Sequence, residues 1–308
     1  MHRFFVKPEL LVGVGAMNCA PTNGRDSAVG AQFIAPKNVE DKDREQVQGN
    51  KGAMNCAPTI ALPTKLAHQV RDVLHIGVGE QLILFDNSGD EVVAEVVRGN
   101  HTGVEVQPVE RRAGKSESPV RIILCQGLLK SARFEWILEK GTELGVSTFV
   151  PTLCRRSMAG LENLGSSKLQ RWQHIIQEAA EQCGRARLPE LLPIRPLRHA
   201  LNDNPPGALA LMPWEEEREQ TLRDVLRLRK EERSPGGTSP GDTQSVDAQF
   251  TKPAITVVLF IGPEGGLMAE EIKLAQRYGV QAVTLGTRIL RAETAALTAI
   301  ANVMYELG

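Results

Sequence analysis

The sequence predicts an α/β protein with a mostly parallel sheet. Short apolar stretches typical of buried strands alternate with helical stretches over the second half of the 308-residue chain. Two of these strands, at 255–261 and 280–285, each run into a glycine turn and then a helix. Ligands of open α/β sheets lie outside the carboxyl ends of strands, so the two turns predict one shared ligand site.

The first of these strands, Ile255–Ile261, is β-branched and apolar with almost no interruption. This composition is typical of a central strand that is buried on both faces. The turn Gly262-Pro263-Glu264-Gly265-Gly266 follows, and its glycines let main-chain N–H and C=O groups approach a ligand closely. A helix is predicted from about Met268 to Tyr278, with acidic residues in its first turn, where the helix dipole favours negative charge.

The second strand, Val280–Leu285, opens into a similar turn and then into the closing helix. Residues 295–304 are apolar around most of that helix, so a deep core or a partner subunit must cover it. Either turn alone is a weak signal, because short motifs are only hypotheses. The pair is more specific, since Arg288, Arg291 and Glu293 are charged residues within an apolar segment.

The remaining elements of a second domain, 119–308, are predicted upstream of the turns. They are strands at 121–125, 148–151 and 208–212, helices at 133–144 and 167–182, and a charged helical segment at 215–232. Residues 234–252 are rich in Ser, Pro, Gly and Thr, which predicts a flexible loop.

A first domain is predicted over residues 1–112, with strands at 3–6, 81–85 and 91–97. The octapeptide Gly-Ala-Met-Asn-Cys-Ala-Pro-Thr occurs twice, at 15–22 and 52–59. One such pair is too short for a solenoid, so we favour a disordered insertion at about 13–60 over a functional module.

Composition limits the function classes. The chain has 36 Lys and Arg against 37 Asp and Glu, a formal net charge of -1, which argues against nucleic-acid binding by bulk charge. Residues 121–200 are locally basic, however, with twelve Lys and Arg against seven acidic residues. The five cysteines are scattered singly, so neither a metal site nor a disulfide framework is expected. With no segment like a signal peptide or a membrane span, a cytoplasmic protein is expected.

Taken together, the two turns resemble the cofactor loops of the SPOUT methyltransferases. The resemblance continues through the segments Gln126–Lys130, Lys140–Val146, Glu178–Arg185 and Met1–Val6. Their order is similar to that of the RsmE family, which methylates N3 of a uridine in 16S ribosomal RNA of the small subunit. The resemblance implies a trefoil-knotted methyltransferase domain preceded by a small PUA-like β-barrel that helps to hold RNA. It also implies S-adenosyl-L-methionine as cofactor and a homodimer through the knot and the C-terminal helix.

The resemblance also implies roles for individual residues. The cofactor is expected to contact Leu211, Met212, Ile261, Gly262, Pro263, Gly265, Gly266, Leu285, Gly286, Ile289, Leu290 and Thr294. The proton of the uridine is expected to be managed by Glu264 and Arg291, assisted by Arg185, whereas Glu293 is expected to cap or orient the closing helix. RNA is expected to contact Arg3, Lys130, Arg133, Arg155, Arg156 and Arg187.

Two alternatives stay open. One is a SPOUT enzyme that methylates another RNA position, such as a tRNA ribose or guanosine. The other is a catalytically impaired RNA-binding factor of ribosome assembly. The insertion favours the second alternative, as does His75, which stands where the family usually has arginine.

Overall fold

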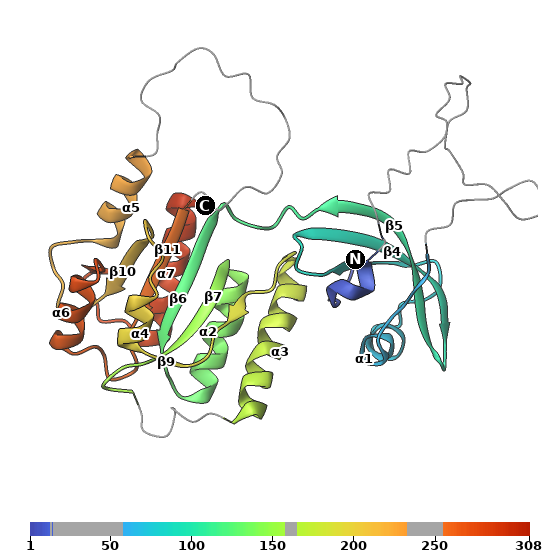
Figure 1. Ribbon diagram of the computed structural model, residues 1–308, viewed down its shortest axis with the longest axis horizontal. Coiled ribbons are helices and arrows are strands. Elements are labelled where there is room, and N and C mark those ends of the chain that lie inside the picture. Colours follow the sequence, from blue (N-terminus) through green and yellow to red (C-terminus); the bar gives the residue numbers. More distant parts are fainter. Residues whose placement is uncertain (13, 15–57, 158–164, 233–254) are drawn as a thin grey trace, which may run out of the picture. The chain divides into compact units, whose positions relative to one another are not determined.

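The computed structural model describes residues 1–12, 14, 58–157, 165–232 and 255–308 (Figure 1). The chain divides into two compact units. The larger contains residues 1–9, 83–91 and 112–308, and the smaller contains residues 10–82 and 92–111. Both glycine turns therefore belong to the larger unit.

A parallel sheet forms the centre of the larger unit. Its strands are β6 (Val120–Gly127), β7 (Val146–Leu153), β8 (Glu190–Leu191), β9 (Arg195–Pro196), β10 (Leu209–Pro213), β11 (Ile255–Ile261) and β12 (Gln281–Val283). They lie in the order β12-β10-β11-β6-β7-β8, with β9 beside β7. Every pairing in this sheet is parallel, which confirms the prediction. β11 lies between β10 and β6 and is buried at six of its seven residues, as predicted for a central strand.

Helices cover both faces of this sheet (Figure 1). One face packs against α2 (Ser131–Glu143), α3 (Ser166–Cys183), α5 (Leu222–Glu231) and α7 (Ala292–Leu307), and the other packs against α4 (Leu197–Asn202) and α6 (Ala269–Arg277). β6 shows why two cores form, because successive side chains of a strand point to opposite faces. Ile122 and Leu124 join the first core, whereas Ile123 and Cys125 join the second. The α/β fold class is confirmed.

A second sheet contains five strands among the residues that the structure describes. They are β1 (Arg3–Phe5), β2 (Ile60–Ala61), β3 (Gln81–Phe85), β4 (Asp90–Asn100) and β5 (Gly103–Ala113), in the order β1-β3-β4-β5-β2. β1 pairs with β3 in parallel, and β2 pairs with β5 antiparallel. Short helical segments accompany them at Pro8–Leu11, at α1 (Thr64–His68) and at a π-helical turn, Gln69–Val73. The predicted strand 81–85 matches β3, and the predicted strand 91–97 lies inside β4.

Two predicted elements are shorter than expected. The charged segment 215–232 is helical only from Leu222, because Thr221 ends the preceding turn and caps α5 by accepting the N–H of Asp224 at 3.1 Å. The strand predicted at 280–285 ends at Val283, because the Thr284 hydroxyl accepts the N–H of Gly286 at 3.2 Å and closes the second glycine turn.

Two predicted loops lie outside the described residues. These are the loop at 234–252 and almost all of the insertion at 13–60. Residue 60 already belongs to β2.

The closing helix α7 is covered along one face. Ala296, Ala299, Ile300 and Val303 are buried, and the helix packs on α2, α5 and β11. Tyr305 is 84% exposed. The prediction that most of the circumference is covered therefore does not hold within a single chain.

Candidate functional site

The first glycine turn leaves the carboxyl end of β11 beside that of β6. A side-chain carbon at Gly127, the last residue of β6, would lie only 2.5 Å from the backbone nitrogen of Pro263. The side chain of Gln126 joins the same two segments, since its amide donates to the carbonyls of Gly127 at 3.0 Å and Gly262 at 3.3 Å. Gly266 has a φ of 74°, which favours glycine, and its N–H donates to the Pro263 carbonyl at 2.9 Å. The turn is therefore compact and leaves little room for side chains.

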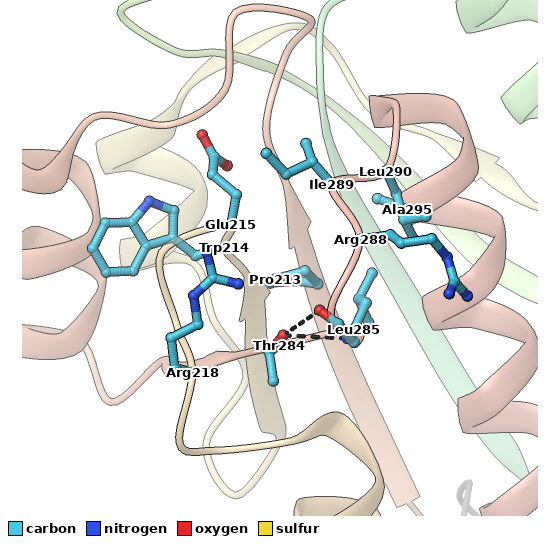
Figure 2. A pocket seen from close by; sticks show the side chains of 11 residues that line it. Pro213, Trp214, Glu215, Arg218, Thr284, Leu285, Arg288, Ile289, Leu290 and Ala295 are labelled. Atoms are coloured by element: carbon cyan, nitrogen blue, oxygen red, sulfur yellow. Dashed lines mark hydrogen bonds between the residues drawn. The ribbon is translucent and has the colours of Figure 1, made fainter.

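The second glycine turn leaves the carboxyl end of β12 and leads into α7. Gly286 has a φ of 124°, and Thr284 holds the turn through its hydroxyl (Figure 2). Arg291 takes the position just before the first turn of α7. Because β10 lies between β11 and β12, its carboxyl end separates the two turns.

The carboxyl end of β10 supplies a wall from residues that sequence reasoning did not name. Pro213, Trp214 and Glu215 line the site, together with Arg218 a few residues later (Figure 2). Leu211 and Met212, which were expected to close the pocket, are 0% and 1% exposed within β10 and line neither cavity described below. The lining begins where the strand ends.

Two adjoining cavities lie at these strand ends. The β12 cavity is lined by Pro213, Trp214, Glu215, Arg218, Thr284, Leu285, Gly286, Arg288, Ile289, Leu290 and Ala295. The β11 cavity is lined by Pro213, Glu215, Ile261, Gly262, Pro263, Glu264, Gly265, Gly266, Leu267, Ile289, Leu290, Arg291, Ala292 and Ala295. They enclose about 450 and 650 Å³ including the open solvent at their mouths.

Most residues expected to hold the cofactor gather around these cavities. Those that line one or both are Ile261, Gly262, Pro263, Gly265, Gly266, Leu285, Gly286, Ile289 and Leu290. Thr294 lies on the exposed part of α7 and lines neither, although its neighbour Ala295 lines both.

Charged side chains lie beside the β11 cavity. Glu264 accepts a hydrogen bond from Nη1 of Arg133 at 2.8 Å, and Nε of the same arginine lies 3.6 Å from Glu293. Arg133 was expected to contact RNA, but here it joins two carboxylates. Arg291 lines the same cavity as Glu264, so two of the three predicted catalytic residues are brought together.

The third predicted catalytic residue, Arg185, lines neither cavity. Its guanidinium donates to Glu117 at 2.9 Å and to the carbonyl of Val146 at 2.6 Å, and the residue is only 6% exposed. Glu117 precedes β6 and Val146 begins β7, so Arg185 lies at the amino ends of the strands. The length of β6 separates the two ends by roughly 23 Å at about 3.3 Å per residue. Arg185 therefore does not reach the cavities of its own chain, and it holds three segments together instead.

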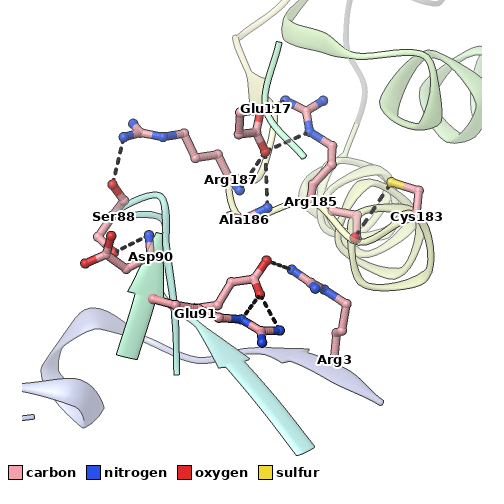
Figure 3. A network of polar contacts seen from close by, with 11 residues as sticks. Arg3, Ser88, Asp90, Glu91, Glu117, Cys183, Arg185, Ala186 and Arg187 are labelled. Atoms are coloured by element: carbon pink, nitrogen blue, oxygen red, sulfur yellow. Dashed lines mark hydrogen bonds and ion pairs between the residues drawn. The ribbon is translucent and has the colours of Figure 1, made fainter. Parts of the chain in front are cut away.

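Two residues predicted to contact RNA are engaged near Arg185. Arg187 donates through Nη2 to the carbonyl of Ser88 at 2.7 Å, and Arg3 pairs with Glu91 at 2.5 Å (Figure 3). Both guanidinium groups thus hold parts of the larger unit together.

Lys130, Arg155 and Arg156 are exposed. Arg156 lies against the first glycine turn, where its Nη1 donates to the carbonyl of Gly265 at 3.0 Å. The backbone N–H of Arg155 donates to Glu271 at 2.9 Å. Among the described residues, no cluster of His, Cys, Asp or Glu suited to a metal ion is present, and no helix is long and apolar enough to cross a membrane.

A parallel sheet with paired glycine turns and adjoining cavities defines a ligand-binding α/β domain. Comparison with known proteins identifies its class, because the model of the RNA methyltransferase domain matches residues 116–304.

Individual relatives narrow the class. The ribosomal RNA small subunit methyltransferase E of Synechocystis sp. is 32% identical over 246 residues, which cover 80% of this chain and 72% of that protein. The Bacillus subtilis protein of the same name is 29% identical over 80% of this chain and 90% of its own length. The crystal structure of the Neisseria gonorrhoeae protein bound to S-adenosyl methionine has a TM-score of 0.65 and 30% identity, and the match covers 82% of this chain and 94% of that one. This chain belongs to the ribosomal RNA small subunit methyltransferase E family.

Proposed function

We propose that this protein transfers the methyl group of S-adenosyl-L-methionine to N3 of a uridine in small-subunit 16S ribosomal RNA. The pair of cavities at the carboxyl ends of β10, β11 and β12 carries the proposal. A relative with 30% identity over most of both chains has been crystallised with S-adenosyl methionine. Nine of the twelve residues expected to hold the cofactor line the same cavities here.

The cofactor would be held largely by main-chain groups. Leu285 and Gly286 of the second turn line the β12 cavity, and Gly262 and Gly266 of the first turn line the β11 cavity. Tight turns free of bulky side chains expose N–H and C=O groups to the edges of an adenosine. Alignment of the acceptor nitrogen with the methyl carbon and sulfur would then supply much of the acceleration.

The chemical difficulty is the acceptor. Uridine N3 carries a proton, and its lone pair becomes a good nucleophile only when that proton leaves. We assign proton acceptance to the Glu264 carboxylate, which Arg133 orients, and stabilisation of the resulting anion to Arg291. N3 then bonds to the methyl carbon, the carbon–sulfur bond breaks, and S-adenosylhomocysteine leaves. The uridine must be unstacked from its neighbours to reach this point.

RNA would approach the rim of the β11 cavity. Lys130 and Arg155 are exposed, and Arg156 lies directly against the glycine turn. Exposed cations beside a base-modifying site suit contacts with phosphate. Arg3, Arg187 and Arg185 are engaged with the chain itself and are weaker candidates for such contacts.

We also propose the trefoil knot and the homodimer that the family resemblance implies. Tyr305, a large aromatic residue of α7, is 84% exposed, which supports a partner subunit at this helix. Sedimentation of the purified protein and of Tyr305→Glu tests this, because a dimer through α7 dissociates in the variant.

The division into a PUA-like RNA-binding domain at 1–112 and a methyltransferase domain at 119–308 is also proposed. Five strands in the described part of residues 1–113 support the barrel, and the RNA methyltransferase match at 116–304 supports the second boundary. A cytoplasmic location follows from the ribosomal substrate.

The decisive experiment is methyl transfer from tritiated S-adenosyl-L-methionine to immature small subunits, followed by mass spectrometry of the nucleosides. We expect N3-methyluridine with the wild-type protein and at least a hundredfold slower transfer with Glu264→Gln, in line with the roughly 10²–10⁴-fold contribution of general bases. Methyl groups on a ribose or a guanosine would point to a different acceptor. RNA binding without transfer would point to an assembly factor.

A further inference from the structure

Glu215 is the charged residue that lines both the β12 cavity and the β11 cavity. Five residues line both cavities, namely Pro213, Glu215, Ile289, Leu290 and Ala295. Four of them are apolar. Glu215 is therefore the charged group at the junction of the two cavities.

The Glu215 carboxylate is also free. Among the residues described, none forms a hydrogen bond or ion pair with it. The other carboxylate of the two cavities, Glu264, is paired with Arg133. Figure 2 shows the Glu215 side chain on the side of Ile289, and the guanidinium of Arg288 points away from it. A carboxylate of this kind is available to a ligand.

The first glycine turn confirms how close this carboxylate lies to the site. A side-chain carbon built at Gly266 would be 2.8 Å from Oε1 of Glu215. The carboxylate thus stands directly over the turn that the proposed cofactor contacts.

The structure of the cofactor determines which of its groups would lie where the two cavities join. S-adenosyl-L-methionine has an adenosine at one end and a methionine at the other, and its positive sulfonium joins them. With one end in each cavity, the sulfonium falls at the junction. We propose that Glu215 is a specificity-determining residue that pairs with the sulfonium charge and so favours the methyl donor over the neutral thioether product. This inference rests on the proposed function, because it takes S-adenosyl-L-methionine as the ligand.

The electrostatic consequence is selective. A carboxylate at contact distance from a cation stabilises that cation, and the effect is smaller where water surrounds the pair. Glu215 is exposed, so a moderate effect of about tenfold in affinity is expected. The product S-adenosylhomocysteine lacks the sulfonium charge, although it keeps the adenosine, the ammonium and the carboxylate. Loss of the Glu215 carboxylate should therefore weaken the binding only of ligands that carry a positive charge at the sulfonium position.

Calorimetry on the full-length protein tests the proposal with three ligands. They are S-adenosyl-L-methionine, S-adenosylhomocysteine and sinefungin, which carries a protonated amine in place of the sulfonium methyl. For Glu215→Gln we expect about tenfold weaker binding of the two cationic ligands, or about 1.4 kcal/mol. Binding of S-adenosylhomocysteine should weaken by less than about threefold, because its charge pattern lacks the group that Glu215 meets. The matched control is Glu216→Gln, the exposed neighbour that lines neither cavity, and it should bind all three ligands as wild type does.

The outcomes separate this proposal from the function on which it depends. If the wild-type protein binds none of the three ligands, the proposed function fails. If the wild-type protein binds them and Glu215→Gln loses all three equally, or loses none, the sulfonium assignment is overturned. An independent check uses the wild-type protein alone: added salt should weaken S-adenosyl-L-methionine binding more than S-adenosylhomocysteine binding, since screening acts on the exposed charge pair. Equal salt dependence contradicts the proposal.

Discussion

Replacing Gly127 with alanine tests whether the glycine turn depends on close contact between the ends of β6 and β11. Gly127 has no positive φ, so alanine meets no backbone strain there. The new methyl group would lie 2.5 Å from the nitrogen of Pro263 and 2.8 Å from the carbonyl carbon of Gly262. Both are backbone atoms, so no side chain can rotate away to relieve the contact.

The size of the effect follows from these distances. Ordinary contact begins at 3.4 Å, so the strand end and the turn would have to separate by about 0.9 Å. Overpacking of a well-packed interior destabilises a protein by about 1–3 kcal/mol. The displaced turn also lines the β11 cavity, so affinity for S-adenosyl-L-methionine should fall by at least about tenfold.

Urea unfolding measures the loss of stability, and calorimetry measures the loss of affinity for S-adenosyl-L-methionine. Gly99→Ala is a suitable control, because nothing lies within 4 Å of the added carbon and its φ is not positive. We expect the control to stay within about 0.5 kcal/mol of wild type. Wild-type stability and cofactor affinity in Gly127→Ala would refute the close approach of the two strand ends.

Three further predictions concern other parts of the larger unit. Arg185→Met should destabilise the protein by about 3–5 kcal/mol in urea unfolding, because it removes a buried guanidinium that pairs with Glu117 and donates to the carbonyl of Val146. Arg171→Met removes a guanidinium that is 67% exposed and should cost less than about 1 kcal/mol, and equal losses would contradict this account. Burial raises the pKa of the Cys125 thiol to about 12. At pH 8 iodoacetamide should therefore leave Cys125 unmodified in the folded protein and modify it in urea, and peptide mass spectrometry measures both outcomes. Arg133→Met should lower kcat about tenfold or more and leave cofactor affinity unchanged, because Arg133 orients Glu264. Arg133→Lys should restore part of the rate. A loss of cofactor affinity instead would mean that Arg133 does not act through Glu264.

Local patterns were sufficient to predict the two glycine turns and the strands before them. The apolar, β-branched residues of Ile255–Ile261 predict a buried strand. The glycine at position 266 indicates a backbone conformation that favours glycine. Both signals depend on neighbouring residues only. For that reason the central strand agrees with the structure, and most of the residues expected to hold the cofactor line one of the two cavities.

The residues with which β10 lines the site could not be predicted in this way. Pro213, Trp214 and Glu215 reach the site only because β10 lies between β11 and β12 in the sheet. Strand order is a property of the whole fold, and the short motif that ends β10 has no glycine signature. The pairing of Arg133 with Glu264, 131 residues away, has the same origin. The sequence showed a basic residue near a helix start but not which carboxylate would face it.

The direction of the parallel strands explains why Arg185 lies apart from the site. In a parallel sheet all carboxyl ends share one edge, and all amino ends share the other. The cavities occupy the carboxyl edge, whereas Arg185, Glu117 and the start of β7 meet at the amino edge. Changes at the two edges should therefore separate in experiment. Substitutions of Arg185 should alter the free energy of unfolding and leave cofactor affinity per folded molecule unchanged, because Arg185 holds segments of the chain together. Substitution of Glu215 should alter cofactor affinity and leave the free energy of unfolding unchanged, because Glu215 faces only the cavities.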